Sequence, residues 1–149
     1  MSYDIYLNNP ETGEVSKVSS FVSYKTVDGK LVQDEQTEAW VNITYNYAKY
    51  FYAVTEGDER FAHRRSASGD VDYGIRGIYG KTGAESIPLL QLMIDRIQER
   101  FIYSDRKWFA AQEIDTSDYW TSTAAYAICP LRQMIRLAKQ CPDSIWDGD

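Results

Sequence analysis

The stretch Gly74-Ile-Arg-Gly-Ile-Tyr-Gly-Lys-Thr-Gly-Ala-Glu-Ser-Ile-Pro88 separates a first half of the chain with strand patterns from a second half with helix patterns. Glycine recurs at every third position, and Arg76 and Lys81 lie among the glycines. Glycine permits a positive φ and a close approach of the backbone to a ligand. The start of a helix adds N–H groups and partial positive charge. The stretch therefore has two interpretations: a turn-rich connection into a helix, or a site for an anion.

Two nucleotide-binding motifs come close to this stretch without matching it. Gly80-Lys81-Thr82 has the form in which a phosphate loop ends, but that motif needs its first glycine at position 75, which is Ile75. The dinucleotide fingerprint requires glycines spaced by two and then by three, whereas here the spacing is three throughout. These mismatches argue against a phosphate-loop hydrolase and a dinucleotide enzyme.

The chain before this stretch has the patterns of an antiparallel sheet. Residues 3–7 alternate apolar and polar positions, as a half-buried strand does, and residues 15–24 predict a second strand or an irregular pair of strands. Asp28-Gly29 is a strong signal for a two-residue hairpin turn. The acidic segment 34–38 is expected to be a solvated edge or a loop.

Residues 39–52 carry the clearest strand pattern of the chain. Asn42, Thr44 and Asn46 fall on one parity, and apolar and aromatic residues, Tyr47 among them, fall on the other. Two interpretations of the polar row stay open: it lines a pocket, or it faces solvent on one side of the sheet. Residues 55–72 follow as an expected mobile loop, whose His63-Arg64-Arg65 cluster is either a solvated loop tip or a phosphate contact.

The second half predicts two long helices. Thr82 and Glu85 have the form of a capping box, but Pro88 would then lie inside the helix, so we expect the first helix to begin at Ser86. Residues 105–112 allow a short helix. One of residues 121–123 caps the last helix, which Pro130 should kink, and Trp146 is expected to fold back onto the protein.

These patterns predict one α+β domain over residues 1–149. Its antiparallel sheet comes from the N-terminal half, and two long C-terminal helices pack on one face of that sheet. No apolar run is long enough to span a bilayer, so we expect a cytoplasmic protein without membrane contact. Cys129 and Cys141 are too far apart on one helix for a disulfide and are expected to be buried thiols.

Composition limits the classes of partner. The net charge of −6 argues against general nucleic-acid binding, which depends on a basic field. Twelve tyrosines and four tryptophans give an aromatic share of 14%, which suits interfaces and sites where rings stack. One histidine and no C-x-x-C pair predict neither a metal site nor a cofactor.

Four parts of the sequence carry a resemblance to a known group of proteins. They are Tyr-Asp-Ile-Tyr-Leu at 3–7, Asn-Ile-Thr-Tyr-Asn-Tyr at 42–47, the stretch 74–88 and the closing Trp-Asp-Gly-Asp at 146–149. In this order they resemble a group of small accessory proteins encoded by tailed bacteriophages, and the segments 59–72 and 100–112 depart from its shorter members. The resemblance implies an accessory protein of the infected bacterial cytoplasm and implies no chemistry.

We therefore predict a non-enzymatic binding protein that counters host defence, either by sequestering a small anionic or nucleotide-like ligand or by blocking a host protein. The alternatives are a small enzyme on a phosphorylated or nucleotide substrate, with Asp70, Asp72 or Glu85 as base, and a structural virion protein. Exposed aromatics and amphipathic helices also predict a homo-oligomer. The candidate ligand-binding residues are Asn42, Thr44, Asn46, Tyr47, Arg76, Tyr79, Lys81 and Thr82.

Overall fold

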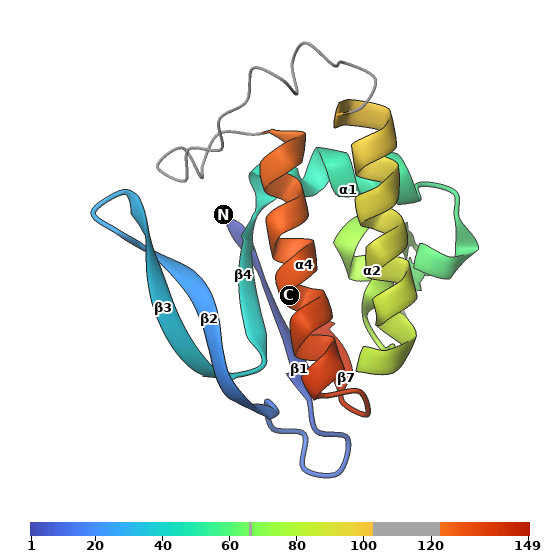
Figure 1. Ribbon diagram of the computed structural model, residues 1–149. Coiled ribbons are helices and arrows are strands. Elements are labelled where there is room, and N and C mark those ends of the chain that lie inside the picture. Colours follow the sequence, from blue (N-terminus) through green and yellow to red (C-terminus); the bar gives the residue numbers. More distant parts are fainter. Residues whose placement is uncertain (66, 103–122) are drawn as a thin grey trace.

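The structure is a computed structural model that describes residues 1–65, 67–102 and 123–149, with the backbone alone at 20–26 (Figure 1). It mixes helices with antiparallel strands, so the expected α+β class is confirmed. The expected single sheet from the N-terminal half is not what forms. Strands are divided among a three-stranded sheet, a two-stranded hairpin and a short two-stranded pair.

The central sheet has the strand order β4-β1-β7. β1 (Ser2–Asn8) pairs antiparallel with β4 (Trp40–Thr44) on one side and with β7 (Ile145–Gly148) on the other. The segment 144–149, expected to be a tail, therefore supplies an edge strand of this sheet. Sequence pattern gave no sign of this, because four residues are too few for a clear alternation.

A long hairpin stands beside the central sheet. β2 (Lys17–Val27) and β3 (Lys30–Glu38) pair across Val27 and Lys30, and the two turn residues, Asp28 and Gly29, both have positive φ. The Asp-Gly turn is thus confirmed as a two-residue hairpin turn. The acidic segment 34–38 belongs to β3, so it is part of a strand and not a loop.

The strand pattern of residues 39–52 is right only as far as Thr44. The Thr44 hydroxyl accepts a hydrogen bond of 3.3 Å from the backbone N–H of Asn46 and caps a 3₁₀ turn, η1 (Tyr45–Tyr47). Helix α1 (Ala48–Thr55) follows directly. Asn42, Thr44 and Asn46 therefore do not form a row on one strand, and the expected polar row is wrong.

Residues 55–72, expected to be a mobile loop, contain short elements. A 3₁₀ turn, η2 (Glu59–Phe61), buries Phe61 completely, and β5 (His63–Arg64) pairs with β6 (Val71–Asp72). The glycine stretch then forms a further 3₁₀ turn, η3 (Gly74–Ile78). This packing could not be predicted from the sequence, because a single apolar residue such as Phe61 sets no periodic pattern.

Helix α2 (Gly83–Ile97) begins earlier than expected. Thr82 and Glu85 form the complete capping box, so the predicted start at Ser86 is wrong and Pro88 lies inside the helix. The capping bonds and the contacts of the first turn outweigh the one helical hydrogen bond that a proline lacks. A π-helical turn, η4 (Gln98–Ile102), continues α2.

Helix α4 (Ala124–Gln140) is capped by Thr123, whose hydroxyl accepts from the Tyr126 N–H at 3.2 Å; the expected cap is confirmed. α2 and α4 lie side by side in Figure 1, and α4 also packs against β4. The expected helix at 105–112 lies outside the described residues. Cys141 is buried but Cys129 is exposed, so one of the two expected buried thiols is wrong.

One hydrophobic core joins the sheet and the helices. Its fully buried side chains include Ile5, Leu7 and Trp146 from the sheet, Phe51 from α1 and Leu90 from α2. Trp146 folds back as expected. Among the described residues, no helix combines the length and the apolar character that are needed to cross a bilayer.

Candidate functional site

The N-terminus of α2, the expected anion site, is occupied by the protein itself. The N–H groups of Gly83 and Ala84 donate to the carbonyls of Ser144 and Pro142 at 2.8 and 2.9 Å. The N–H of Glu85 donates to the Thr82 hydroxyl at 3.1 Å, which is one half of the capping box. These three donors are therefore used to hold the C-terminal segment and the cap, and they do not face a ligand.

Lys81 and Thr82 are placed by the same segment. The Lys81 carbonyl accepts from the Trp146 N–H at 3.0 Å, and the neighbouring Gly80 N–H donates to the Trp146 carbonyl at 2.9 Å. Backbone pairing with β7 therefore explains this part of the glycine stretch. Gly83 has a second reason to be glycine, because a Cβ there would collide with the Cys141 carbonyl at the end of α4.

Arg76 and Tyr79 come together away from that helix start. The Arg76 Nε donates to the backbone carbonyl of Asp149 at 3.0 Å, and the Tyr79 hydroxyl donates to the same oxygen at 3.3 Å. The Arg76 guanidinium also lies over the ring of Tyr3, 5.1 Å from its centroid. Tyr3 in turn packs edge-on against Tyr45, with ring centroids 4.4 Å apart.

Burial dominates the electrostatics of the two tyrosines beside Arg76. It raises the pKa of Tyr79 well above its ordinary value, and it raises the pKa of Tyr3, while the positive charge of Arg76 opposes both shifts. Both phenols therefore stay protonated at neutral pH and do not act as bases, and the Tyr79 hydroxyl serves as a hydrogen-bond donor.

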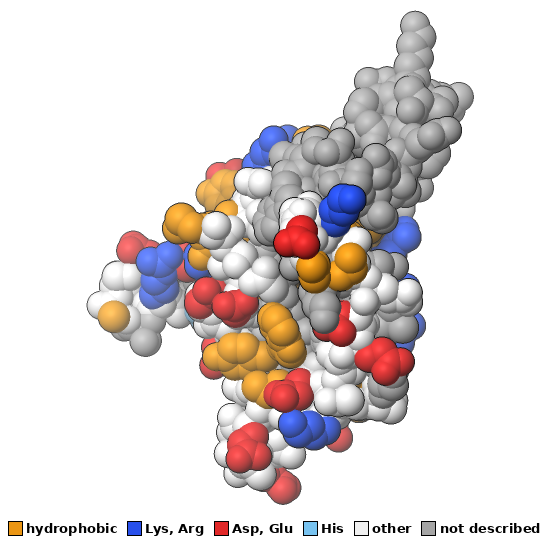
Figure 2. All heavy atoms as spheres, turned by 90° about the vertical axis from the view of Figure 1, so that its left-hand side faces the viewer, with side chains coloured by type: hydrophobic (Ala, Val, Ile, Leu, Met, Phe, Trp, Pro, Cys, Tyr) orange, Lys and Arg blue, Asp and Glu red, His pale blue; other side chains and the backbone are white. Residues whose placement is uncertain are grey.

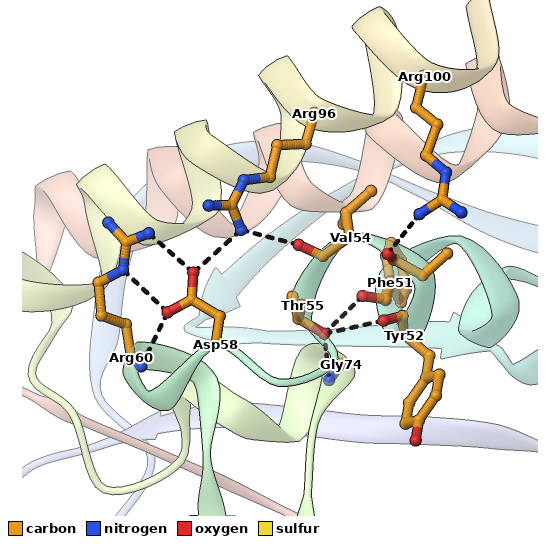
Figure 3. A network of polar contacts seen from close by, with 10 residues as sticks. Phe51, Tyr52, Val54, Thr55, Asp58, Arg60, Gly74, Arg96 and Arg100 are labelled. Carbon is orange, nitrogen blue, oxygen red and sulfur yellow. Dashed lines mark hydrogen bonds and ion pairs between the residues drawn. The ribbon is translucent and has the colours of Figure 1, made fainter.

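Arg76 differs from the arginines that anchor the helices. Figure 3 shows that Arg60 and Arg96 both reach the Asp58 carboxylate. The N–O distances of these two ion pairs are 2.8 and 3.1 Å. Arg100 donates to the Ala53 carbonyl at 2.7 Å. Within the part of the chain that the structure describes, Arg76 forms no ion pair with a side-chain carboxylate, and its Nε bonds the main-chain oxygen of Asp149 instead. A half-buried guanidinium without such a pair is the feature of the expected site that the structure keeps.

The His63-Arg64-Arg65 cluster is tied to its own loop. Arg64 forms an ion pair with Glu59 at 3.0 Å. Arg65 forms a bidentate ion pair with the Asp72 carboxylate, with N–O distances of 2.7 and 2.9 Å. The hydrogen bonds from Arg65 lower the pKa of Asp72, with a smaller contribution from Arg76. The Asp72 carboxylate is thus a fixed anion and a poor general base.

The other four residues that were expected to bind the ligand do not belong to the Arg76 cluster. Tyr47 and Thr44 are buried, and Asn46 lies exposed in the η1 turn. Asn42 is on the surface of β4 and donates from Nδ2 to the Asp4 carboxylate at 2.7 Å and to the Ser2 hydroxyl at 2.8 Å. Of these four, Asn42 therefore lies on the exposed side of the central sheet.

That side of the sheet carries a surface that sequence reasoning missed. We call it the outer face and define it by Asp4, Tyr6, Trp40, Asn42 and Asp147. Tyr6 lies directly opposite Trp40 on one neighbouring strand and opposite Asp147 on the other. The Trp40 side chain is 43% exposed. Its parity with Asn42 was the signal available in the sequence, since an aromatic ring on the polar side of a half-buried strand points away from the core.

An open hollow adjoins the outer face. Its volume is about 550 Å³, and its lining includes Tyr6, Asn8, Glu14, Val15, Lys17 and Glu38. Figure 2 looks onto the side of the molecule where the β2–β3 hairpin lies and shows hydrophobic side chains gathered at its centre with acidic side chains around them. Tyrosine and tryptophan are enriched in protein interfaces, so this surface is a candidate binding surface.

No family model, curated protein or solved structure compared with the chain matches it. Over residues 1–65, 67–102 and 123–149, no three His, Cys, Asp or Glu side chains are grouped so as to hold a metal ion. The candidate sites therefore rest on two features of the structure, the Arg76 cluster (Arg76, Tyr3, Tyr45 and Tyr79) and the outer face.

Proposed function

We propose that this chain is a non-enzymatic binding protein that blocks a host protein by covering part of its surface. The observation that carries the proposal is the exposed Trp40 ring opposite Tyr6 on the outer face. In this proposal the protein acts in the infected bacterial cytoplasm, as the resemblance to phage accessory proteins implies, and counters host defence.

Exposed aromatic side chains support a binding role for physical reasons. Single apolar residues on a surface are ordinary, but Trp and Tyr supply large, rigid contact area at a low cost in side-chain entropy. Here one such pair lies across neighbouring strands and beside a hollow. We also propose that α2 and α4 together back the opposite face of the sheet, which leaves the outer face to the partner.

Capture experiments test this function. Tagged wild-type protein is incubated with bacterial lysate beside Trp40→Ala and the control Tyr52→Ala, whose ring is 47% exposed on α1. We expect one retained protein with wild type and with Tyr52→Ala, and its loss with Trp40→Ala. Equal retention by all three would overturn the proposal.

Incubation of purified protein with nucleotides separates binding from the enzyme alternative, which requires turnover.

A second candidate function is sequestration of a small anionic or nucleotide-like ligand at Arg76. The observation that favours it is the Arg76 guanidinium over the Tyr3 ring, which has no side-chain carboxylate paired with it among the described residues. A guanidinium beside a ring offers charge and a planar surface, which suits a phosphate and a base. Negative charge around Arg76 weakens this candidate, because carboxylates repel an anion. The carboxylates concerned are those of Asp4, Asp72, Asp147 and Asp149.

A further inference from the structure

The outer face is acidic as well as aromatic. Asp4 and Asp147 lie on β1 and β7 on the same side of the sheet as Tyr6, and Glu14 and Glu38 line the adjoining hollow. Lys17 lines the hollow too, but it pairs with Glu38 at 3.4 Å, so its charge is offset. The described lining therefore presents excess negative charge around exposed rings.

Two of these carboxylates are held in place. Asp4 accepts a hydrogen bond of 2.7 Å from Asn42, which is its cross-strand partner. Asp147 accepts from the Gly148 N–H at 2.8 Å. A carboxylate whose direction is fixed before binding loses less entropy when it takes up a donor from a partner.

We propose that the outer face binds a basic segment of a partner protein, with one arginine side chain stacked on Trp40 and other arginines paired with the carboxylates of Asp4 and Asp147. Guanidinium ions stack on aromatic faces, and Trp is the strongest acceptor of this kind. The planar fork of N–H donors also matches a carboxylate. This inference rests on the proposed function, because it names the chemistry of the partner that the same surface covers.

Charge argues against the other occupants. A second copy of this chain would bring its own acidic surface toward Asp4 and Asp147, and with a net charge of −6 each the two copies repel. Nucleic acid is disfavoured for the same reason. A basic partner gains from both the rings and the carboxylates.

The test uses two labelled peptides of about eight residues. One alternates arginine with serine, and the other replaces each arginine by citrulline, which keeps the shape and removes the charge. Binding to the full chain is followed by fluorescence anisotropy at low salt. We expect the citrulline peptide to bind at least about tenfold more weakly, and Trp40→Ala to weaken the arginine peptide by a similar factor.

Charge-neutral variants isolate the carboxylates. Asp4→Asn with Asp147→Asn keeps an acceptor oxygen at each position while it removes both charges, and should weaken the arginine peptide on the order of threefold to tenfold. The control is Glu99→Gln with Asp143→Asn, two exposed acids away from the outer face that change the net charge equally. The control should bind like wild type. Thermal melts of both variants confirm that they are folded.

Several results would overturn the inference. The first is equal binding of the two peptides, and the second is that the control substitutions weaken the arginine peptide as much as Asp4→Asn/Asp147→Asn does. The third is that sedimentation shows a dimer of the wild type that is lost with Trp40→Ala, which would make a second copy the occupant. The proposed function fails separately. If the lysate partner is lost with Trp40→Ala but kept with Asp4→Asn/Asp147→Asn, the surface still docks a protein and only the basic segment is wrong.

Discussion

The indole N–H of Trp146 donates a hydrogen bond of 2.7 Å to the hydroxyl of Ser86, and both side chains are buried. The Ser86 hydroxyl in turn donates to the Gly83 carbonyl at 2.8 Å. This chain of bonds joins the last strand of the sheet to the first turn of α2. The same segment fills the helix N-terminus through Pro142 and Ser144, so the expected anion site and the fold of the C-terminal segment compete for one set of donors.

Ser86→Ala should destabilise the protein by about 1–3 kcal/mol, because it leaves the buried indole N–H without an acceptor. Urea unfolding measures the change. Trp146→Phe removes the donor as well as some packing, so adding Ser86→Ala to it should cost much less than Ser86→Ala alone. Additive effects of the two substitutions would show that the bond does not couple them.

Gly77→Ala should destabilise the protein by about 1–3 kcal/mol or more, since a Cβ would collide with the carbonyl of Phe61 and lie 2.8 Å from its Cα. The obstacle is backbone and cannot rotate away. Gly57→Asn is the control: Gly57 has a φ of +78°, nothing lies within 4 Å of an added Cβ, and Asn tolerates this conformation. If both variants melt alike, close packing at Gly77 is not what requires glycine.

Local signals in the sequence predicted the local features of this fold. Asp28-Gly29 indicated the hairpin turn, and residues 121–123 were expected to contain the cap of α4, which is Thr123. The Thr82–Glu85 pair has the form of a capping box, and only Pro88 argued for a later helix start. Each of these depends on residues within a few positions of one another, where side-chain chemistry decides the backbone.

Long-range pairing could not be predicted in this way. The partners of the α2 N–H groups lie about sixty residues further along the chain, in the segment 142–146, and nothing in the glycine stretch indicates them. The end of β4 was missed because residues 45–47 continue the alternation while the Thr44 hydroxyl turns the backbone into η1. The outer face was missed because Tyr6 and Trp40 meet only when β1 pairs with β4.

Asp58→Asn should make the free energy of unfolding less dependent on pH in the acidic range. Hydrogen bonds from Arg60, and further from Arg96, hold the pKa of the Asp58 carboxyl well below its ordinary value. A lowered pKa in the folded state means that the stabilisation is fully present above the unfolded pKa of about 4 and is lost as the pH falls below it. The gap between wild type and variant should be about 1 kcal/mol at pH 7, because these ion pairs are partly exposed.

Denaturant midpoints at pH 7 and pH 3 measure that gap for Asp58. We expect it to shrink at the lower pH. The side-chain amide oxygen that Asp58→Asn introduces can still accept from the Arg60 N–H, so the cap of η2 remains and the difference reports the charge. A gap that is equal at both pH values would show that the charge contributes nothing.

Arg76 and Lys81 give the last prediction, since the sequence placed both in one anion site and the structure gives them different surroundings. Arg76→Ala combined with Lys81→Ala should abolish binding of a phosphate-bearing ligand if the Arg76 cluster takes one. The single variants show how much each residue contributes to binding. The Arg76 guanidinium lies over Tyr3, and the Tyr79 hydroxyl shares its acceptor. Lys81 is held through a backbone hydrogen bond to β7. Loss of one charge-assisted hydrogen bond costs about 1.5–3 kcal/mol, so Arg76→Ala alone should weaken adenosine monophosphate at least about tenfold and Lys81→Ala should do so less. Calorimetric titration beside the wild type measures both. Equal affinities for all the proteins would mean that the glycine stretch serves only as the connection between β6 and α2.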